Sequence, residues 1–148
     1  MSPISLLQAL RNAVEAERAS AVFYRELIPL ARDDKTTDLL DELARDEDAH
    51  AERLIELADS LVVDPLPAAA TELAEIVEAP PPLSSRAGIS YVKALYVALE
   101  AEHHATHFYD LVAEETSGEV SELFRTLAQF ERRHAERLER LLADATSP

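Results

Sequence analysis

The sequence predicts an all-α fold, a four-helix bundle made of two duplicated helical hairpins joined by a long crossover that contains a short helix. Three observations support this prediction. Helix-favouring Ala, Leu, Glu and Arg are abundant, and only two glycines occur in 148 residues. Apolar residues recur at steps of three and four along four segments, as they do on one face of a helix. The two halves of the chain also resemble each other, which indicates a repeated hairpin.

We expect one domain over residues 1–148, because this length suits a single hydrophobic core. Within it, hairpin one is expected over residues 2–61, the crossover over 62–88 and hairpin two over 89–144. Prolines near both ends of the crossover bracket a short apolar patch, which predicts the short helix.

Local signals mark the ends of the helices. The Ser-Pro pair at residues 2–3 suits the N-cap and the first position of the first helix. Pro29 should end or kink that helix, because proline disrupts a helix interior. Two aspartates at 33–34 supply a polar turn and an N-cap for the second helix. Gly118 is predicted to form a C-cap-like turn between the third and fourth helices.

The internal repeat is the most informative feature of the sequence. AERASAVFY at residues 16–24 matches AEHHATHFY at 101–109, and LARDEDAHAERL at 43–54 matches LAQFERRHAERL at 127–138. Two similar hairpins are expected to pack about a pseudo-twofold axis. Residues present in both copies should therefore face each other across that axis.

Polar residues interrupt the apolar face of each helix near its middle. The first and third helices each place one Glu there, and the second and fourth each place a Glu and a His three residues apart. In each hairpin the two Glu residues are about equally far from the turn, so all should lie at one level of the bundle. These six residues are Glu17, Glu47, His50, Glu102, Glu131 and His134.

Four carboxylates at one level of a core need cations, because burying them unpaired is strongly unfavourable. The nearby Lys and Arg residues lie off the apolar faces, so ion pairing explains the carboxylates poorly, whereas two divalent metal ions would neutralise them. Imidazole would add one nitrogen ligand to each metal. These ligands suit two iron ions, with manganese or zinc as alternatives. The absence of Cys excludes thiolate sites and iron–sulfur clusters.

Several other polar residues near this layer are assigned to the surface. Glu15 and Glu100 also repeat, but they point to the opposite side of their helices. Asp46 and Asp48 are predicted to face solvent, because the matching residues of the second half are Phe and Arg.

Two further groups leave alternatives open. Tyr24 and Tyr109 lie two turns beyond the Glu of their own helices and either fill the core or hydrogen-bond a ligand carboxylate. His103, His104 and His107 project away from the apolar face of the third helix. They form either a solvated or interface surface or an auxiliary site for metal uptake or exchange.

One Glu on the first and third helices and Glu-x-x-His on the second and fourth resemble the di-iron carboxylate pattern of the rubrerythrin and bacterioferritin branch of the ferritin-like superfamily. The resemblance covers essentially the whole chain. It implies ligands to two iron ions: Glu17 and Glu102 as terminal carboxylates, Glu47 and Glu131 as bridges, and His50 and His134 on one metal each. The predicted catalytic residues are Glu47, Glu131, Tyr24 and Tyr109.

Three departures from the family pattern bear on function. Ala105 stands where rubrerythrins typically carry a further carboxylate. No Cys is present for a rubredoxin-type domain, so electrons for peroxide reduction would come from another protein. Met1 is the only methionine, and the short tail after the fourth helix leaves little room for the fifth helix of large ferritin cages, so a haem-containing storage shell is disfavoured.

The leading hypothesis is a di-iron oxidoreductase of rubrerythrin type, which oxidises Fe(II) with H₂O₂ or O₂ and is reduced again by an external electron donor. The alternatives are an iron-storage protein with a ferroxidase centre and a non-catalytic bundle that is metal-stabilised or binds a partner. A homodimer or larger homo-oligomer is expected. The net charge of −15 argues against nucleic acid and membranes as partners. The lack of a signal-like or membrane-spanning apolar run predicts a cytoplasmic protein.

Overall fold

The computed structural model describes residues 4–63, 72–73 and 88–147. Within these residues the long helices are α1 (Leu6–Leu27), α2 (Asp34–Val63), α3 (Tyr91–Glu115) and α4 (Gly118–Thr146). A short 3₁₀ turn, η1 (Ile28–Leu30), follows α1. Two-residue strands, β1 (Ile4–Ser5) and β2 (Glu72–Leu73), pair in antiparallel fashion. The predicted all-α bundle is confirmed, with this small strand pair as an addition.

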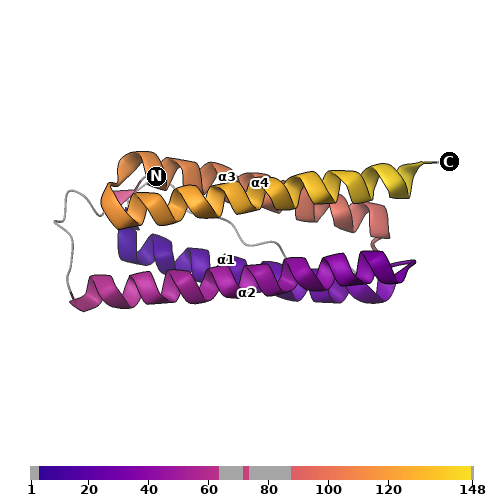
Figure 1. Ribbon diagram of the computed structural model, residues 1–148, viewed down its shortest axis with the longest axis horizontal. Coiled ribbons are helices and arrows are strands. Elements are labelled where there is room, and N and C mark those ends of the chain that lie inside the picture. Colours follow the sequence, from indigo (N-terminus) through magenta and orange to yellow (C-terminus); the bar gives the residue numbers. More distant parts are fainter. Residues whose placement is uncertain (1–3, 64–71, 74–87, 148) are drawn as a thin grey trace.

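The helices lie side by side as two antiparallel hairpins, α1 with α2 and α3 with α4 (Figure 1). The end of α2 and the start of α3 are at opposite ends of the bundle, so these two helices run in the same direction. The chain must therefore cross from one end of the bundle to the other between α2 and α3, which agrees with the predicted crossover. The short helix predicted there falls mostly outside the described residues, and the two that are described form β2.

The start of α1 differs from the prediction. The helix begins at Leu6, and the Ser5 hydroxyl accepts a hydrogen bond from the Gln8 amide at 3.1 Å. Ser5 is extended and belongs to β1, so the helical conformation cannot start before it. The predicted start at residues 2–3, which lie outside the described chain, is therefore too early. A serine does form the N-cap, but it is the second serine of the sequence.

The turn between α1 and α2 follows the prediction. The helix α1 ends at Leu27, and Pro29 lies within η1, where its fixed backbone angle is tolerated. Asp33 then caps α2, because its carboxylate accepts a hydrogen bond from the Thr36 amide at 2.7 Å. These two features set the register of hairpin one.

Gly118 has a different role from the one predicted. It adopts a positive φ of 64° and opens α4 instead of closing α3. Side-chain hydroxyls satisfy the last carbonyls of α3 in its place. Thr116 donates to the Val112 carbonyl at 2.6 Å, and Ser121 of α4 donates to the Ala113 carbonyl at 2.7 Å. Glycine was expected to cap α3 because it is the usual residue at helix C-termini. Hydroxyl groups that reach back across a turn can take this role, but they leave little signal in the sequence.

The hydrophobic core consists of two clusters, one on each side of a layer of buried polar residues. The cluster nearer the α3–α4 turn includes Leu10, Val14, Leu54, Phe108 and Phe124. The cluster at the other end includes Phe23, Leu27, Leu43, Leu95 and Leu138. Each fully buried side chain of this kind stabilises the fold by about 1.5–3 kcal/mol. None of the described helices has a stretch long and apolar enough to cross a membrane.

Candidate metal centre

Six polar residues fill the layer between the two apolar clusters, and each residue is at most 4% exposed. Helices α1 and α3 each supply one Glu, and α2 and α4 each supply a Glu and a His. A Glu and a His three residues apart lie on the same helix face, so both reach the core. The structure brings all six predicted residues together: Glu17, Glu47, His50, Glu102, Glu131 and His134.

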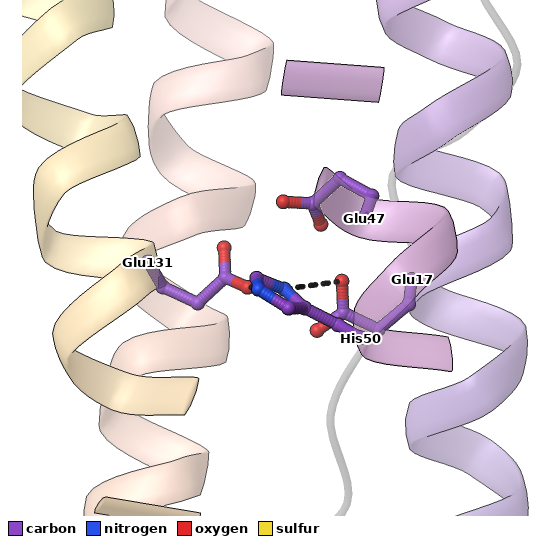
Figure 2. A group of neighbouring side chains, drawn as sticks. All are labelled: Glu17, Glu47, His50 and Glu131. Carbon is purple, nitrogen blue, oxygen red and sulfur yellow. Dashed lines mark hydrogen bonds and ion pairs between the residues drawn. The ribbon is translucent and has the colours of Figure 1, made fainter. Parts of the chain in front are cut away.

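These residues form two overlapping groups. Potential ligand atoms of the first group lie within 4.8 Å of one another and come from Glu17, Glu47, His50 and Glu131. Figure 2 shows this group, with Glu131 reaching from α4 toward the residues of hairpin one. The second group consists of Glu47, Glu102, Glu131 and His134. Glu47 and Glu131 belong to both groups, so they lie between two positions suited to cations.

Both imidazoles turn the same ring nitrogen toward the carboxylates. The Nδ1 atom of His50 lies 3.1 Å from a Glu131 oxygen and 3.7 Å from a Glu17 oxygen. The Nδ1 atom of His134 lies 2.7 Å from a Glu47 oxygen and 3.5 Å from a Glu131 oxygen. The two rings are nearly parallel, at 19°, with their centres 5.8 Å apart. Each of the two groups of residues thus contains one imidazole that faces its carboxylates.

Several buried atoms of this layer have no hydrogen-bond partner within the described structure. They are one oxygen of each of the four Glu residues and the Nδ1 atom of His134. The approach of His134 Nδ1 to Glu47 at 2.7 Å is close, but it lacks the alignment of a hydrogen bond. Each unsatisfied buried polar atom typically costs about 1–3 kcal/mol. Oxygen and nitrogen lone pairs that converge without donors are what a metal ion requires, so the residues fit one.

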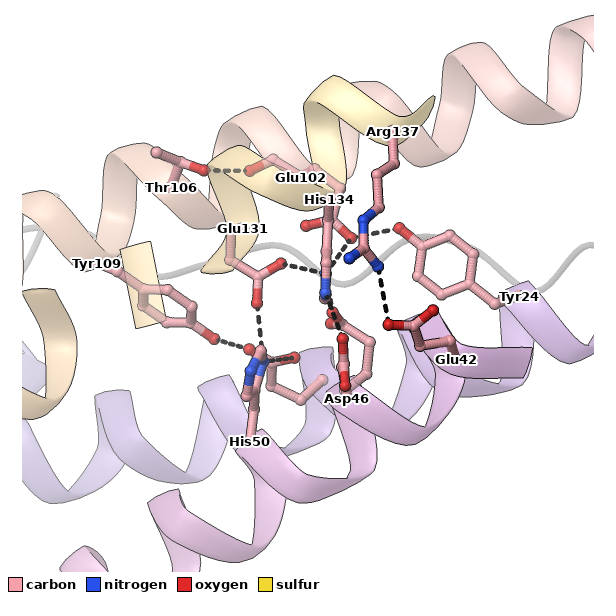
Figure 3. A network of polar contacts seen from close by, with 12 residues as sticks. Tyr24, Glu42, Asp46, His50, Glu102, Thr106, Tyr109, Glu131, His134 and Arg137 are labelled. Carbon is pink, nitrogen blue, oxygen red and sulfur yellow. Dashed lines mark hydrogen bonds and ion pairs between the residues drawn. The ribbon is translucent and has the colours of Figure 1, made fainter. Parts of the chain in front are cut away.

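Tyr24 and Tyr109 connect the two hairpins at this layer (Figure 3). Tyr24 of α1 donates a hydrogen bond to Glu102 of α3, and Tyr109 of α3 donates to Glu17 of α1 at 2.5 Å. Burial raises the pKa of both hydroxyls well above the usual value, and the nearby carboxylates raise it further. The phenols are therefore neutral donors at physiological pH. Of the two alternatives, the hydrogen-bonded one describes these tyrosines.

Three of the carboxyl groups have raised pKa values, which shift them toward the protonated form. Burial raises the pKa of Glu47 well above its usual value, and the carboxylates of Glu131 and Glu17 raise it further. Burial and Glu131 do the same for Glu102. The pKa of Glu131 is also raised, by burial and by Glu17. Metal binding opposes this shift, because carboxylate ligands must be deprotonated.

The pKa values of Glu17 and His134 are shifted in the directions that favour their charged forms. Burial opposes ionisation of Glu17, but hydrogen bonds with Glu47 and His50 outweigh it and lower the pKa of Glu17. Burial likewise opposes the charged form of His134, but Glu102 and Glu131 outweigh it and raise its pKa to about 11. The raised pKa values of His134 and of three Glu residues thus favour proton uptake by this layer when no metal is bound.

Asp46 corrects the prediction that it faces solvent. Its side chain is 34% exposed, and its carboxylate lies 3.1 Å from the Nε2 atom of His134, on the side of the ring opposite the buried Glu cluster (Figure 3). The comparison of the two halves missed this contact because the matching residue is Phe130. A signal was available nonetheless, because Asp46 precedes His50 by four residues and therefore lies near the inner face of α2.

The other residues predicted to lie at the surface do so. Glu15 and Glu100 are exposed. Asp48 is half exposed and pairs with Arg25 at 2.6 Å.

The histidines of α3 are also exposed. His104 lies 3.9 Å from Glu100, and His103 lies 3.9 Å from Glu139. Within the described residues, neither they nor His107 belong to a group of three or more close potential ligands. The surface alternative therefore fits these residues better than a further metal site.

Comparison with known proteins agrees with this geometry. The chain matches the family model described as Rubrerythrin over residues 8–142. A structure described as a ferritin-like diiron-carboxylate protein from Thermotoga maritima is 20% identical with a TM-score of 0.83, covering 99% of each chain. A hypothetical protein from Pyrococcus furiosus is 23% identical with a TM-score of 0.71, covering 94% of this chain and 89% of its own. No curated protein is similar enough to count as a match.

The two solved structures establish the ferritin-like fold, and the family model spans nearly the whole four-helix region. Together with the buried groups of Glu and His, they identify the chain as a member of the rubrerythrin family.

Proposed function

We propose that this chain is a di-iron oxidoreductase that oxidises Fe(II) with hydrogen peroxide or O₂. The observation that carries the proposal is the pair of overlapping groups that share Glu47 and Glu131. Two metal ions bridged by carboxylates can act on one oxidant together, which a single ion cannot do. Two bound Fe(II) ions would supply the two electrons that, with two protons, reduce one H₂O₂ to two H₂O.

The role of each ligand follows from which of the two groups of residues it belongs to. Glu47 and Glu131 would bridge both ions, because they alone belong to both groups. Glu17 and His50 would complete one position, and Glu102 and His134 would complete the other. Carboxylates can change between bridging and chelating modes as the metal charge changes, whereas imidazole holds one direction.

The tyrosines act on the terminal carboxylates rather than on the metals. Each phenol donates to one oxygen of Glu17 or Glu102 and leaves the other oxygen for the metal. The hydrogen bond thereby orients the carboxylate. We therefore assign Tyr24 and Tyr109 to positioning of these two carboxylates in the resting site.

Electrons to restore Fe(II) must come from outside these 148 residues, which contain no Cys and hence no thiolate-bound redox centre. The two apolar clusters enclose the site at both ends, so a donor protein cannot touch the metal ligands directly. Small oxidants can reach such a site more easily than a protein donor can. We expect electron transfer to occur through the bundle rather than by direct contact.

Stopped-flow kinetics can test the proposal. Metal-free protein is loaded anaerobically with two equivalents of Fe(II) and mixed with one equivalent of H₂O₂, and Fe(III) formation is followed by absorbance. Full oxidation within seconds is expected. The variant Glu131→Gln keeps the side-chain volume but removes a carboxylate that would bridge the metals, and we expect oxidation to be about 10- to 100-fold slower. Glu136→Gln, at an exposed position of the same helix, is the matched control.

Two outcomes would contradict the proposal. Oxidation no faster than that of free Fe(II) would show that the bound metals are not catalytic and would favour the non-catalytic bundle. Equal rates in wild type and Glu131→Gln would show that oxidation occurs elsewhere on the protein. Size-exclusion chromatography of the iron-loaded sample would separately distinguish a small oligomer from a mineral-storing shell.

A further inference from the structure

The two histidines have different neighbours outside the Glu cluster, although the same residue types surround them inside it. Behind His134, the Asp46 carboxylate lies 3.1 Å from Nε2. In the neutral imidazole that binds a metal, an acceptor at Nε2 holds the ring proton there and leaves the Nδ1 lone pair for the metal. That Nδ1 atom is the one directed at the Glu cluster, and it has no hydrogen-bond partner within the described structure. His134 is therefore already oriented for coordination.

An aromatic ring stands at the matching place beside His50. Phe130 immediately precedes Glu131, as Asp46 immediately precedes Glu47. Its ring centre lies 5.1 Å from that of His50, and the two rings meet edge to face at 65°. A phenyl ring is at best a weak hydrogen-bond acceptor and carries no charge. The carboxylates within 4 Å of His50 in the described chain, Glu17 and Glu131, approach Nδ1 and not Nε2.

Charges outside the layer increase the difference. The guanidinium of Arg133 lies 4.4 Å above the Phe130 ring, which places a positive charge on the His50 side. On the His134 side, the guanidinium of Arg137 pairs with Glu42 at 3.2 Å. Asp46 therefore keeps its interaction with His134 (Figure 3). A cation is favoured beside Asp46 and disfavoured near Arg133.

We propose that the two metal positions are unequal and that the position at His134 fills first, because Asp46 orients His134 whereas Phe130 offers His50 no such partner. This inference rests on the proposed function, since it takes the six buried residues to be metal ligands. It identifies Asp46 as a positioning residue that acts through His134. The position at His50 is then the one that exchanges its metal more readily.

Anomalous diffraction with Co(II) tests the order of filling without reference to activity. Crystals of the full chain are grown with one equivalent of Co(II), and data are collected at the cobalt absorption edge. A partner of this kind typically changes metal affinity about 10- to 100-fold. At half saturation, that range corresponds to a roughly three- to tenfold difference in occupancy, and we expect the larger peak at His134.

Three variants show whether Asp46 causes the difference. Asp46→Ala should bring the occupancy ratio close to one and weaken the tighter step of a Co(II) titration about 10- to 100-fold. Asp46→Asn retains an oxygen that accepts from Nε2, so it should restore part of the ratio. Asp48→Ala is the matched control, because it removes an acid of similar exposure from the same helix and should leave the ratio unchanged.

Each other outcome overturns the proposal in a distinguishable way. Equal peaks in the wild type, or a larger peak at His50, would show that the order of filling is wrong. An unchanged ratio in Asp46→Ala would show that Asp46 is not its cause. No cobalt at the six-residue layer would overturn the proposed function together with this inference.

Discussion

Hairpin one and hairpin two contain the same buried ligand-type residues but differ in the residues beside them. In hairpin one, Arg25 follows Tyr24 and pairs with Asp48, which follows Glu47. In hairpin two the same two positions hold Asp110 and Arg132, which also pair. The ion pair is kept with its charges exchanged, because attraction requires only opposite signs.

The contrast between Asp46 and Phe130 is of another kind. These residues occupy matching positions but cannot replace each other, since one accepts a hydrogen bond from His134 and the other packs against His50. The comparison teaches that the inner layer is nearly symmetric while its support is not. Experiments that alter matching residues in the two hairpins can therefore separate shared features from those belonging to one side.

The largest effect is expected on metal content. Glu47→Ala should lose both metals, because Glu47 belongs to both groups, whereas Glu17→Ala should lose one. After metal loading and dialysis, elemental analysis should give about two metals per chain in wild type, about one in Glu17→Ala and nearly none in Glu47→Ala. Glu15→Ala, at an exposed position on α1, should keep both. Equal losses in the Glu17 and Glu47 variants would contradict the shared role of Glu47.

The pH dependence of the metal-free protein should differ between Glu102 and Glu17. The pKa of Glu102 is raised, so its stabilising contribution is present below pH 4.5 and is lost as pH rises through the folded pKa. His134 acts in the same direction, with its contribution present below pH 6.5 and lost toward about pH 11. The pKa of Glu17 is lowered, so its contribution is present above pH 4.5 and is lost in acid.

Denaturant unfolding in the presence of a chelator, at about pH 5, 6.5 and 8, can check these signs. Wild type should lose stability as pH rises, and Glu102→Gln should reduce that loss. Glu17→Gln should lower the stability at all three pH values by a similar amount. A pH dependence of Glu102→Gln equal to that of wild type would show that Glu102 does not hold a proton in the folded metal-free state.

The two tyrosines should contribute about equally, since each hydroxyl donates to a buried carboxylate of the other hairpin. In the metal-loaded protein, where both carboxylates are ionised, Tyr24→Phe and Tyr109→Phe should each lower the unfolding free energy by about 1.5–3 kcal/mol, the usual range for hydrogen bonds to charged groups. Denaturant unfolding measures both. Tyr96→Phe provides the control, because Tyr96 is 56% exposed and should show almost no change. A large effect for only one of the two buried tyrosines would contradict their symmetry.

The exchanged ion pairs should give the smallest effect. All four side chains are between 37% and 50% exposed, so solvent screens the attraction. A double-mutant cycle on Arg25 and Asp48 should yield a coupling of about 0.2–1 kcal/mol. The reversed pair, Arg25→Asp with Asp48→Arg, should recover most of it, because hairpin two uses that arrangement. No recovery would mean that the two pairs differ in geometry as well as in sign.

The internal repeat explains how much of this site could be predicted from the sequence. A ligand-type residue needed on both sides of a pseudo-twofold axis occurs twice, so Glu17 and Glu102, or His50 and His134, stand out against apolar neighbours. The same comparison failed for Asp46, whose role exists on one side only. Its contact with His134 depends on how closely α2 and α4 approach, and a sequence pattern does not contain that distance.

The helix ends show the same limit. Pro29 and Asp33 act within a few residues of themselves, so their effects on α1 and α2 were predictable. The caps at the end of α3 include Ser121, which reaches back from the next helix to the Ala113 carbonyl. The crossed hydrogen bonds of Tyr24 and Tyr109 likewise join separate hairpins. Local chemistry can be read along the chain, whereas contacts between hairpins require the fold.

The most direct test of the central claim is an anomalous difference map from crystals saturated anaerobically with Fe(II) and measured at the iron absorption edge. We predict two iron peaks in the polar layer, one beside Glu17 and His50 and the other beside Glu102 and His134, with Glu47 and Glu131 between them. A single peak, or iron bound only at the exposed histidines of α3, would contradict the two-metal site.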